Sequence, residues 1–182
     1  PLRIWVIGLL TLGMGSMIYK VFFYVLVGRK YEYMINSIER VQDVLMIKMV
    51  PLKKRMSYSN GQFAYFSFLN KTISKEEHPF SIVSQSDSYY LEIAIKKLGD
   101  YTALLDSLQL GDKVNIRGAH GDFGSNLGLY KREIWVGAGI GVTPFLSLNP
   151  PPHTTFYYLS RSGEDALFSH AIQQKVDRSN HN

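Results

Sequence analysis

A glycine-rich segment at residues 137–145, GAGIGVTPF, has the clearest chemical potential in this sequence. It follows a short apolar run at residues 134–136 and continues into a predicted helix. A strand that enters a helix through a glycine turn presents free backbone N–H groups and the positive end of the helix dipole. Gly137, Gly139 and Gly141 would also let the backbone approach a phosphate that a Cβ atom would keep away. The pattern predicts a pyrophosphate site, although its spacing differs from the common dinucleotide fingerprint and it also fits an ordinary structural turn.

Two shorter segments contain residue types that suit a flat cofactor. In the first, His-Pro-Phe-Ser at residues 78–81, Phe80 could lie against a planar ring while Ser81 donates a hydrogen bond at its edge. The second is the loop GAHGDF at residues 118–123, which directly follows a predicted strand. Each segment alone also fits a simpler interpretation, with Phe80 in the core, His78 on the surface and the loop as an ordinary turn.

The elements that must position these segments change in character along the chain. From residue 31 the apolar residues alternate, and six short strands at near-regular spacing predict a small antiparallel barrel. These strands are expected at residues 31–39, 44–50, 61–69, 81–84, 89–95 and 113–117. Thr102 is a suitable N-cap for a helix between the last two strands.

After residue 130 the order becomes strand, glycine turn, helix and strand, which is typical of the start of a parallel nucleotide-binding sheet. The second strand is expected at residues 156–159, between helices at residues 142–148 and 164–176. Such a sheet usually has about five strands, so we expect this nucleotide-binding domain to be incomplete.

The N-terminal residues are strongly apolar. Residues 4–19 carry no charge, and the run resumes after Lys20 at residues 21–27. A helix through both runs would span roughly 36 Å, against a hydrocarbon core of roughly 30 Å, so we predict a transmembrane helix. A buried core helix is the alternative, whereas a signal peptide would be shorter and followed by a cleavage site. Because the chain begins with Pro1, we expect a fragment whose helix is the last of a larger membrane domain.

Composition excludes several classes of function. The chain contains no cysteine, which excludes disulfides, thiolate zinc sites and thiol nucleophiles within it. Residues 1–60 hold nine Lys/Arg and three Asp/Glu, whereas residues 61–182 hold eleven and twelve. Positive charge beside an apolar span indicates the cytoplasmic side of a membrane, so we expect a membrane surface and no nucleic acid as partner. The sequence shows no cluster of His and carboxylate residues, so we predict no metal site.

The order of these motifs resembles the ferredoxin–NADP reductase superfamily, and most closely its membrane NADPH oxidase and ferric reductase branch. His-Pro-Phe-Ser at residues 78–81 is similar to that branch's motif, and residues 137–145 match its nicotinamide-nucleotide loop at every position. The resemblance covers residues 3–161, about nine-tenths of the chain. It implies an N-terminal transmembrane helix (residues 1–28), an antiparallel β-barrel FAD-binding domain (29–130) and an incomplete α/β parallel-sheet NADP-binding domain (131–182).

The resemblance also implies an FAD site. Its residues would be His78, Pro79, Phe80, Ser81, Ile93, Ile95, Lys96, Thr102, Gly118 and Gly121. In this interpretation the Phe80 ring stacks on the flavin, and the catalytic Ser81 hydroxyl lies near the flavin N5 atom that accepts hydride. Residues 93–96 would follow the ribityl and diphosphate groups, and the helix at Thr102 would help to bind the pyrophosphate.

An NADPH site is implied in the same way. Its residues would be Gly137, Gly139, Ile140, Gly141, Thr143, Pro144 and Arg161. Thr143 would lie close to the reacting nicotinamide ring as the second catalytic residue. Arg161 would pair with the adenosine 2′-phosphate, since a guanidinium binds two phosphate oxygens at once.

The function implied is an oxidoreductase in which NADPH reduces FAD, and FAD passes electrons singly to haem. The haem would lie in transmembrane helices upstream of this chain, the final acceptor would be dioxygen or ferric iron, and this part would lie on the cytoplasmic side. Two alternatives stay open. One is a soluble-type reductase that serves an iron–sulfur partner, and the other is a truncated flavin-binding or assembly module without turnover.

Overall fold

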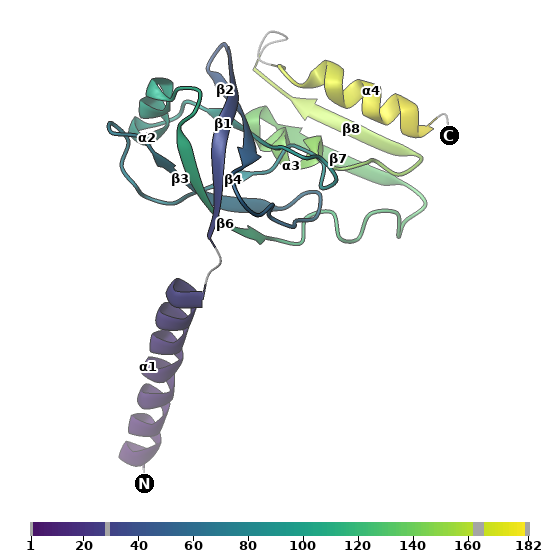
Figure 1. Cartoon of the computed structure of the whole chain (residues 1–182). Helices are drawn as coiled ribbons and strands as arrows, with labels where there is room; N and C mark the ends of the chain where they lie inside the picture. Colours follow the sequence, from purple (N-terminus) through teal and green to yellow (C-terminus); the bar gives the residue numbers. More distant parts are fainter. Residues whose placement is uncertain (1, 28–29, 162–165, 181–182) are drawn as a thin grey trace. The chain divides into compact units, whose positions relative to one another are not determined.

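The computed structural model describes residues 2–27, 30–161 and 166–180 (Figure 1). The chain divides into two compact units, residues 1–30 and residues 31–182, which are described separately.

The first unit is the helix α1, Leu2–Val27. Among the described residues no helix is long and apolar enough to cross a membrane, so the predicted transmembrane helix at residues 1–28 is wrong. The sequence accounts for this, because Gly8, Gly13 and Gly15 add no side-chain surface to the helix and Lys20 interrupts its apolar run.

The second unit begins with six strands: β1 (Lys30–Val41), β2 (Val44–Pro51), β3 (Phe63–Leu69), β4 (His78–Ser81), β5 (Leu91–Lys96) and β6 (Lys113–His120). They form one sheet in the order β4-β3-β6-β1-β2-β5, with β4 and β5 at its two ends. The pairings of β1 with β2, β2 with β5, and β3 with both β4 and β6 are antiparallel.

This sheet is open, so the predicted barrel is wrong. Among the described residues β4 and β5 are not paired as a ladder, and the two edges meet in an isolated bridge between Ile82 and Ile93. Strand β4 has only four residues. One of them is Pro79, which lacks the N–H group that a ladder needs and is therefore suited to an edge strand. Strand β4 covers His78–Ser81 and not the predicted residues 81–84, because residues 78–81 are the ones that pair with β3.

The apolar residues of the sheet alternate in burial as the strand period requires. On β3, Ala64, Phe66 and Phe68 are fully buried, while Phe63 and Tyr65 on the other face are half-buried. The short helix α2 (Asp100–Leu104) and the 3-10 turn η1 (Leu105–Ser107) add apolar residues to the same core. Residues 31–120 therefore have a well-filled core of their own.

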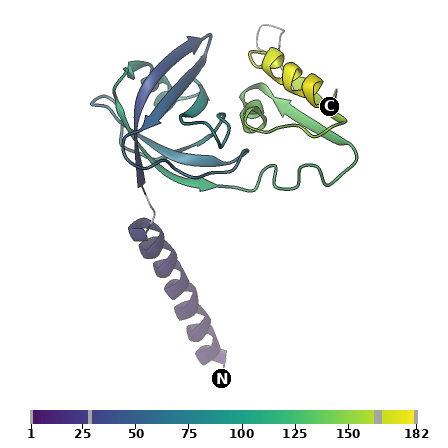
Figure 2. The same ribbon diagram turned by 45° about the vertical axis from the view of Figure 1, so that its right-hand side comes forward.

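The remaining elements form a smaller parallel sheet. Strands β7 (Glu133–Ala138) and β8 (Thr154–Leu159) pair in parallel, as the strand–glycine turn–helix–strand order predicted. Between them lie the 3-10 turn η2 (Gly139–Val142) and the one-turn helix α3 (Thr143–Leu146), in place of the predicted helix at residues 142–148. Helix α4 (Ser169–Asn180) packs along β8 (Figure 2). The predicted helix at residues 164–176 begins partly outside the described residues.

The two sheets are joined by a shared apolar cluster. Val83, which follows β4, and Ala94 of β5 pack with Val142 and with the buried α4 residues Ile172 and Val176. This contact fixes the glycine turn beside strand β5 within the second unit.

Candidate functional site

Strands β4 and β5 bring together two segments that the sequence analysis assigned to one site. Residues 78–81 form β4 and residues 93–96 belong to β5, at opposite ends of the strand order. Their edges approach each other where Ile82 pairs with Ile93 and the Val83 N–H donates to the Glu92 carbonyl at 2.9 Å. We call residues 78–83 and 92–96 the edge seam. The open sheet therefore places the predicted flavin residues along two edges that are otherwise unpaired among the described strands.

The side chains of β4 alternate between two faces. His78 is opposite Phe66 and Phe80 is opposite Ala64, so both lie on the face that covers the core. The half-buried Phe80 ring lies 5.9 Å from the Phe66 ring. Pro79 and Ser81 point to the other face, because successive strand residues alternate. The Phe80 ring and the Ser81 hydroxyl thus lie on opposite faces, and a ligand must meet them at the strand edge.

His78 has an aromatic partner that the sequence analysis did not identify. Its imidazole stacks on the Tyr101 ring from α2, with ring centroids 3.5 Å apart and an interplanar angle of 26°. Within the described residues, His78 Nε2 and the Tyr101 hydroxyl are buried atoms without a hydrogen-bond partner. Glu76 Oε2 lies 3.4 Å from Nε2, but not in hydrogen-bond geometry. Burial, and then the Glu76 charge, raise the pKa of Tyr101 to about 12.

The β5 side of the edge seam has fewer side chains that a ligand could contact. Ile93 and Ile95 are buried in the core, so a ligand could meet only their backbone. The Lys96 ammonium forms an ion pair with Asp43, with Nζ and Oδ2 3.1 Å apart. Lys96 would have to exchange this partner to contact a phosphate.

Thr102 does not cap α2, so that prediction is wrong. The N-cap is Gly99, and Thr102 is the third helical residue. Its hydroxyl accepts hydrogen bonds from the Leu98 and Gly99 N–H groups at 2.9 and 3.1 Å and donates to the Gly99 carbonyl. The hydroxyl therefore stabilises the start of the helix from its first turn. Helix propensity alone does not show whether Thr102 or Gly99 is the N-cap. Its assignment to FAD stays a prediction.

Gly118 and Gly121 both have a positive φ that favours glycine, and Gly118 also packs closely against β3. Gly118 has φ +140°, and a Cβ there would lie 3.2 Å from the Cβ of Ala64. Gly121 has φ +95°, a Cβ there would touch the Phe63 ring at 3.4 Å, and its carbonyl accepts from Gln62 Nε2 at 2.8 Å. Backbone conformation at both positions, and close packing at Gly118, account for these glycines, and their contact with FAD stays a prediction.

The glycine turn after β7 contains glycines of two kinds. Gly137 packs against β8, where a Cβ would lie 3.1 Å from Phe156 Cζ. A Cβ at Gly139 or Gly141 would meet no described atom within 4 Å, although Gly139 has φ +50°. Packing thus explains Gly137, while the space beside Gly139 and Gly141 is open to a ligand.

The parallel register brings Arg161 to the same end of the sheet as this turn. Ala138, the last residue of β7, pairs with Leu159, the last residue of β8. Gly139 and the exposed Arg161 therefore follow the carboxyl ends of neighbouring strands, where ligands of open α/β sheets usually bind. Of the other predicted residues, Ile140 and Pro144 are half-buried and Thr143 is buried.

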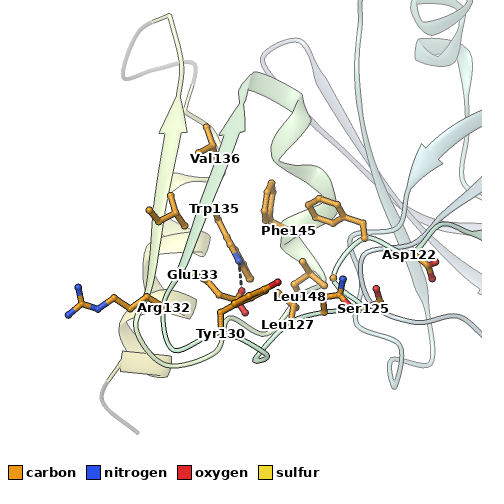
Figure 3. A pocket seen from close by; sticks show the side chains of 14 residues that line it. Asp122, Ser125, Leu127, Tyr130, Arg132, Glu133, Trp135, Val136, Phe145 and Leu148 are labelled. Atoms are coloured by element: carbon orange, nitrogen blue, oxygen red, sulfur yellow. Dashed lines mark hydrogen bonds between the residues drawn. The ribbon is translucent and has the colours of Figure 1, made fainter.

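A separate cavity of about 420 Å³ lies beside β7 (Figure 3). Residues 122–127 form one side of it, and Trp135, Phe145 and Leu148 form much of the rest. Glu133 shapes its wall, because its carboxylate accepts hydrogen bonds from Trp135 Nε1 at 3.0 Å and from the Gly128 N–H at 2.7 Å. None of the predicted FAD or NADPH residues lines this cavity.

The comparisons with known proteins bear directly on the edge seam. The sequence pattern of a family described as "FAD-binding domain" matches residues 31–123, slightly more than half of the chain. The chain belongs to this family. The match contains β4, β5, α2 and the two packed glycines, and it ends before the parallel sheet.

Relatives of this chain include the reductase component of a propane 2-monooxygenase from Mycolicibacterium smegmatis. It is 29% identical over 141 residues, which make up 71% of this chain and 40% of that protein. The heavy chain of a superoxide-generating NADPH oxidase from Dictyostelium discoideum is 28% identical over 178 residues, 79% of this chain and 34% of that protein. The predicted resemblance to NADPH oxidases is confirmed. The chain spans about a third to two fifths of the length of these relatives.

Solved structures share the fold. A ferredoxin NADP+ reductase from Neisseria gonorrhoeae with bound FAD and NADP superposes with a TM-score of 0.67 and 20% identity. The match covers 82% of this chain and 65% of that one.

In the described part of the chain, no group of three or more His, Asp or Glu side chains is placed to hold a metal ion.

Proposed function

We propose that this chain is the flavin-binding part of an NAD(P)H-dependent oxidoreductase, with FAD along the edge seam and NADPH at the glycine turn. The observation that carries the proposal is the meeting of the two predicted flavin segments at the open edges of the sheet. Membership of the FAD-binding domain family supports it, and so do the relatives named as an oxidase and a reductase component.

The residues present fit the cofactor. His78 Nε2 and the Tyr101 hydroxyl are buried polar atoms that no described residue satisfies, and such atoms normally have a partner in the functional state. Bound FAD would supply a ring that accepts hydride from NADPH and releases electrons one at a time. The chain's own residues would bind the flavin and orient it. Phe80 offers an apolar face beside the core, and Ser81 offers a hydroxyl at the strand edge.

The proposed NADPH site depends on three residues. Gly139 and Gly141 leave room for a phosphate to approach the backbone, and Arg161 supplies a charged donor at the same end of the sheet. We infer that Arg161 contacts the 2′-phosphate, so replacing it should weaken NADPH binding more than NADH binding.

The electron acceptor is the finer part of the proposal. The relative named as a superoxide-generating NADPH oxidase supports dioxygen as the terminal acceptor. The family resemblance implies that a haem partner carries the electrons to it, with ferric iron as the other terminal acceptor. The monooxygenase reductase component has nearly the same identity to this chain and supports the second candidate, a reductase that serves an oxygenase partner. Stopped-flow oxidation of the reduced flavin by dioxygen, a ferric chelate or an iron–sulfur protein distinguishes these acceptors by their rates.

We also propose that this part lies at the cytoplasmic face of a membrane. The basic excess of residues 1–60 supports an anionic lipid surface. Flotation with vesicles that contain anionic lipid should carry the protein upwards at low salt and not at high salt. Equal recovery with neutral vesicles would contradict this localisation.

The main experiment is a titration of the purified chain with FAD, followed by flavin fluorescence. Replacing Phe80 with Leu keeps an apolar side chain beside the core and removes the ring, so FAD should bind about tenfold more weakly. Phe156→Leu is the matched control, because the half-buried Phe156 lies on β8, outside the edge seam. Failure of the unaltered chain to bind FAD would overturn the proposal.

NADPH addition tests the hydride step separately. The flavin absorbance of the FAD-loaded chain should bleach under anaerobic conditions. A flavin that binds tightly but stays oxidised would restrict this chain to flavin binding and exclude hydride transfer within it.

A further inference from the structure

Strand β4 is anchored by an ion pair as well as by its own ladder. It has four residues, and among the described strands it forms a ladder with β3 alone. Glu77 directly precedes β4, and Arg117 lies on β6, on the far side of β3. Arg117 Nε and Nη2 both donate to Glu77 Oε2, at 2.8 and 2.6 Å. This contact therefore connects the start of β4 to a strand with which it has no ladder.

The Tyr65 ring supports the arginine side chain between these two strands. Tyr65 of β3 is opposite Pro79 of β4 and opposite Arg117 of β6. These side chains are on the face of the sheet that points away from the core, since the alternate residues of β3 are buried in the core. Arg117 Cζ lies 4.7 Å from the centroid of the Tyr65 ring, and a guanidinium is attracted to an aromatic face. We call Glu77, Tyr65 and Arg117 the strand clamp.

The ion pair of the strand clamp is largely shielded from water. The Arg117 and Glu77 side chains are 19% and 27% exposed. The pair between Lys53 and Glu32, by comparison, has side chains that are 79% and 49% exposed. Exposed ion pairs contribute little to stability, whereas the loss of one partner from a buried pair is strongly unfavourable. The strand clamp should therefore restrict β4 much more than a surface pair would.

The strand clamp lies next to the residues proposed to contact the flavin. Glu77 is one residue before His78 and three before Phe80. Towards β5 there is no ladder among the described strands, and the two edges meet in the isolated bridge between Ile82 and Ile93. The position of β4 in the edge seam thus depends on β3 and on the strand clamp. A binding group that is fixed before its ligand arrives loses less conformational entropy on binding.

We propose that Arg117 is a positioning residue for the flavin site, which acts through Glu77 to fix β4 and thereby the Phe80 ring. Arg117 itself does not contact the cofactor in this proposal. The inference rests on the proposed flavin site and adds to it a residue on the opposite side of β3 from the edge seam. It predicts that changes at Arg117 weaken flavin binding chiefly while the Phe80 ring is present.

The first test is a titration of the whole chain and its variants with FAD, followed by flavin fluorescence. Arg117→Met keeps an apolar stem beside Tyr65 and removes the donors, so FAD should bind about tenfold more weakly. Arg117→Lys keeps the charge and one donor for the same Glu77 oxygen, so its loss should be no more than about threefold. Lys53→Met is the matched control, because it breaks an exposed ion pair outside the edge seam, and it should leave FAD affinity unchanged.

The second test distinguishes positioning from a general effect on the fold. If Arg117 acts through the placement of the Phe80 ring, the two residues should not contribute independently to FAD affinity. Arg117→Met should then weaken FAD binding by no more than about threefold when Phe80→Leu is already present. A general effect would weaken binding about tenfold in both backgrounds, and this result would overturn the inference.

The other outcomes separate the inference from the proposed function. Unchanged FAD affinity in Arg117→Met, or equal losses in Arg117→Met and Arg117→Lys, overturns the inference and leaves the proposed function intact. If the unaltered chain does not bind FAD, both fail. If Arg117→Met does not fold because the Glu77 charge stays shielded, the double variant Glu77→Gln/Arg117→Met removes both charges. It should fold and bind FAD about tenfold more weakly, and normal binding by this variant would overturn the inference.

Discussion

The six-stranded sheet and the two-stranded parallel sheet bury their apolar residues to very different degrees. Ile47, Phe66 and Ile93 of the larger sheet have no exposed surface. On β7 and β8, by contrast, Ile134 is 70% exposed and Tyr157 is 57% exposed. Isolated pairs of strands have marginal stability, so the smaller sheet must depend on its contacts with α4 and with the larger sheet. The part assigned to FAD has its own core, whereas the part assigned to NADPH is stabilised by contacts with its neighbours.

The connection between the two regions is short and specific. The Gly61 N–H donates to the Ser147 hydroxyl at 2.8 Å, and the Ser147 side chain is fully buried. Gly61 precedes β3, and Ser147 directly follows α3. This bond therefore links the strand beside β4 to the end of the glycine turn.

The largest predicted difference compares one apolar strand residue from each sheet. Phe66→Ala should lower the free energy of unfolding by about 3–5 kcal/mol, because it leaves a cavity in a filled core. Ile134→Ala should change it by no more than about 0.5 kcal/mol, because the side chain is already 70% exposed. Urea titrations followed by circular dichroism measure both. Equal losses would contradict the contrast between the sheets.

A glycine at the junction should have the next largest effect. Gly61 has φ +85°, and a Cβ there would lie 2.2 Å from the Phe123 carbonyl oxygen. Gly61→Ala should therefore cost about 1–2 kcal/mol for the backbone conformation and about 1–3 kcal/mol more for the clash. Gly111→Ala is the matched control, since Gly111 has φ +89° and open space around it. If both variants lose the same stability, the close packing at the junction is not energetically important.

The hydrogen bond at the junction tests how far the smaller sheet depends on the larger one. Ser147→Ala leaves the Gly61 N–H buried without a partner, so it should cost about 1–3 kcal/mol. Trp135 lies on β7 and reports on the smaller sheet by fluorescence. We expect its transition to move to lower urea than the circular dichroism transition of the larger sheet. The exposed Ser57→Ala is the control, and coincident transitions in Ser147→Ala would show that the two regions unfold together.

The smallest predicted effect is a pH dependence in the smaller region. Burial lowers the pKa of Lys175, whose ammonium donates to the Leu146 and Leu148 carbonyls at the end of α3. Because the unfolded chain keeps this proton to higher pH than the folded chain, stability should rise as the pH approaches the ordinary lysine value of 10.5.

Lys175→Met should remove this rise, while Lys71→Met at an exposed position should retain it. Urea titrations at several alkaline pH values give the comparison. A rise that persists in Lys175→Met would assign it to another group.

The sequence allowed some of these features to be predicted because they depend on local pattern. The parallel pairing of β7 and β8 followed from the strand–glycine turn–helix order, and the glycines at 137 and 139 marked the turn. The open sheet was not predictable in this way. Strand spacing does not show whether two edge strands pair, and that outcome depends on the short β4 and on Pro79.

Features that depend on distant partners were also missed. Tyr101 stacks on His78, which is 23 residues earlier in the chain. The only signal for Tyr101 in the sequence is that this aromatic residue directly precedes Thr102. The ion pair between Lys96 and Asp43 joins the end of β5 to the turn before β2, and it depends on the register of these two strands, which is a tertiary property. Single-sequence patterns contain no information on such pairs.

Pro79 has a consequence for the protein without its cofactor. An unpaired strand edge is a template on which another chain can add a strand and begin aggregation. Strand β4 is such an edge, and Pro79 removes one of the few backbone donors that an added strand would use. The residue that the family resemblance assigns to FAD therefore also protects the empty protein from joining its neighbours edge to edge.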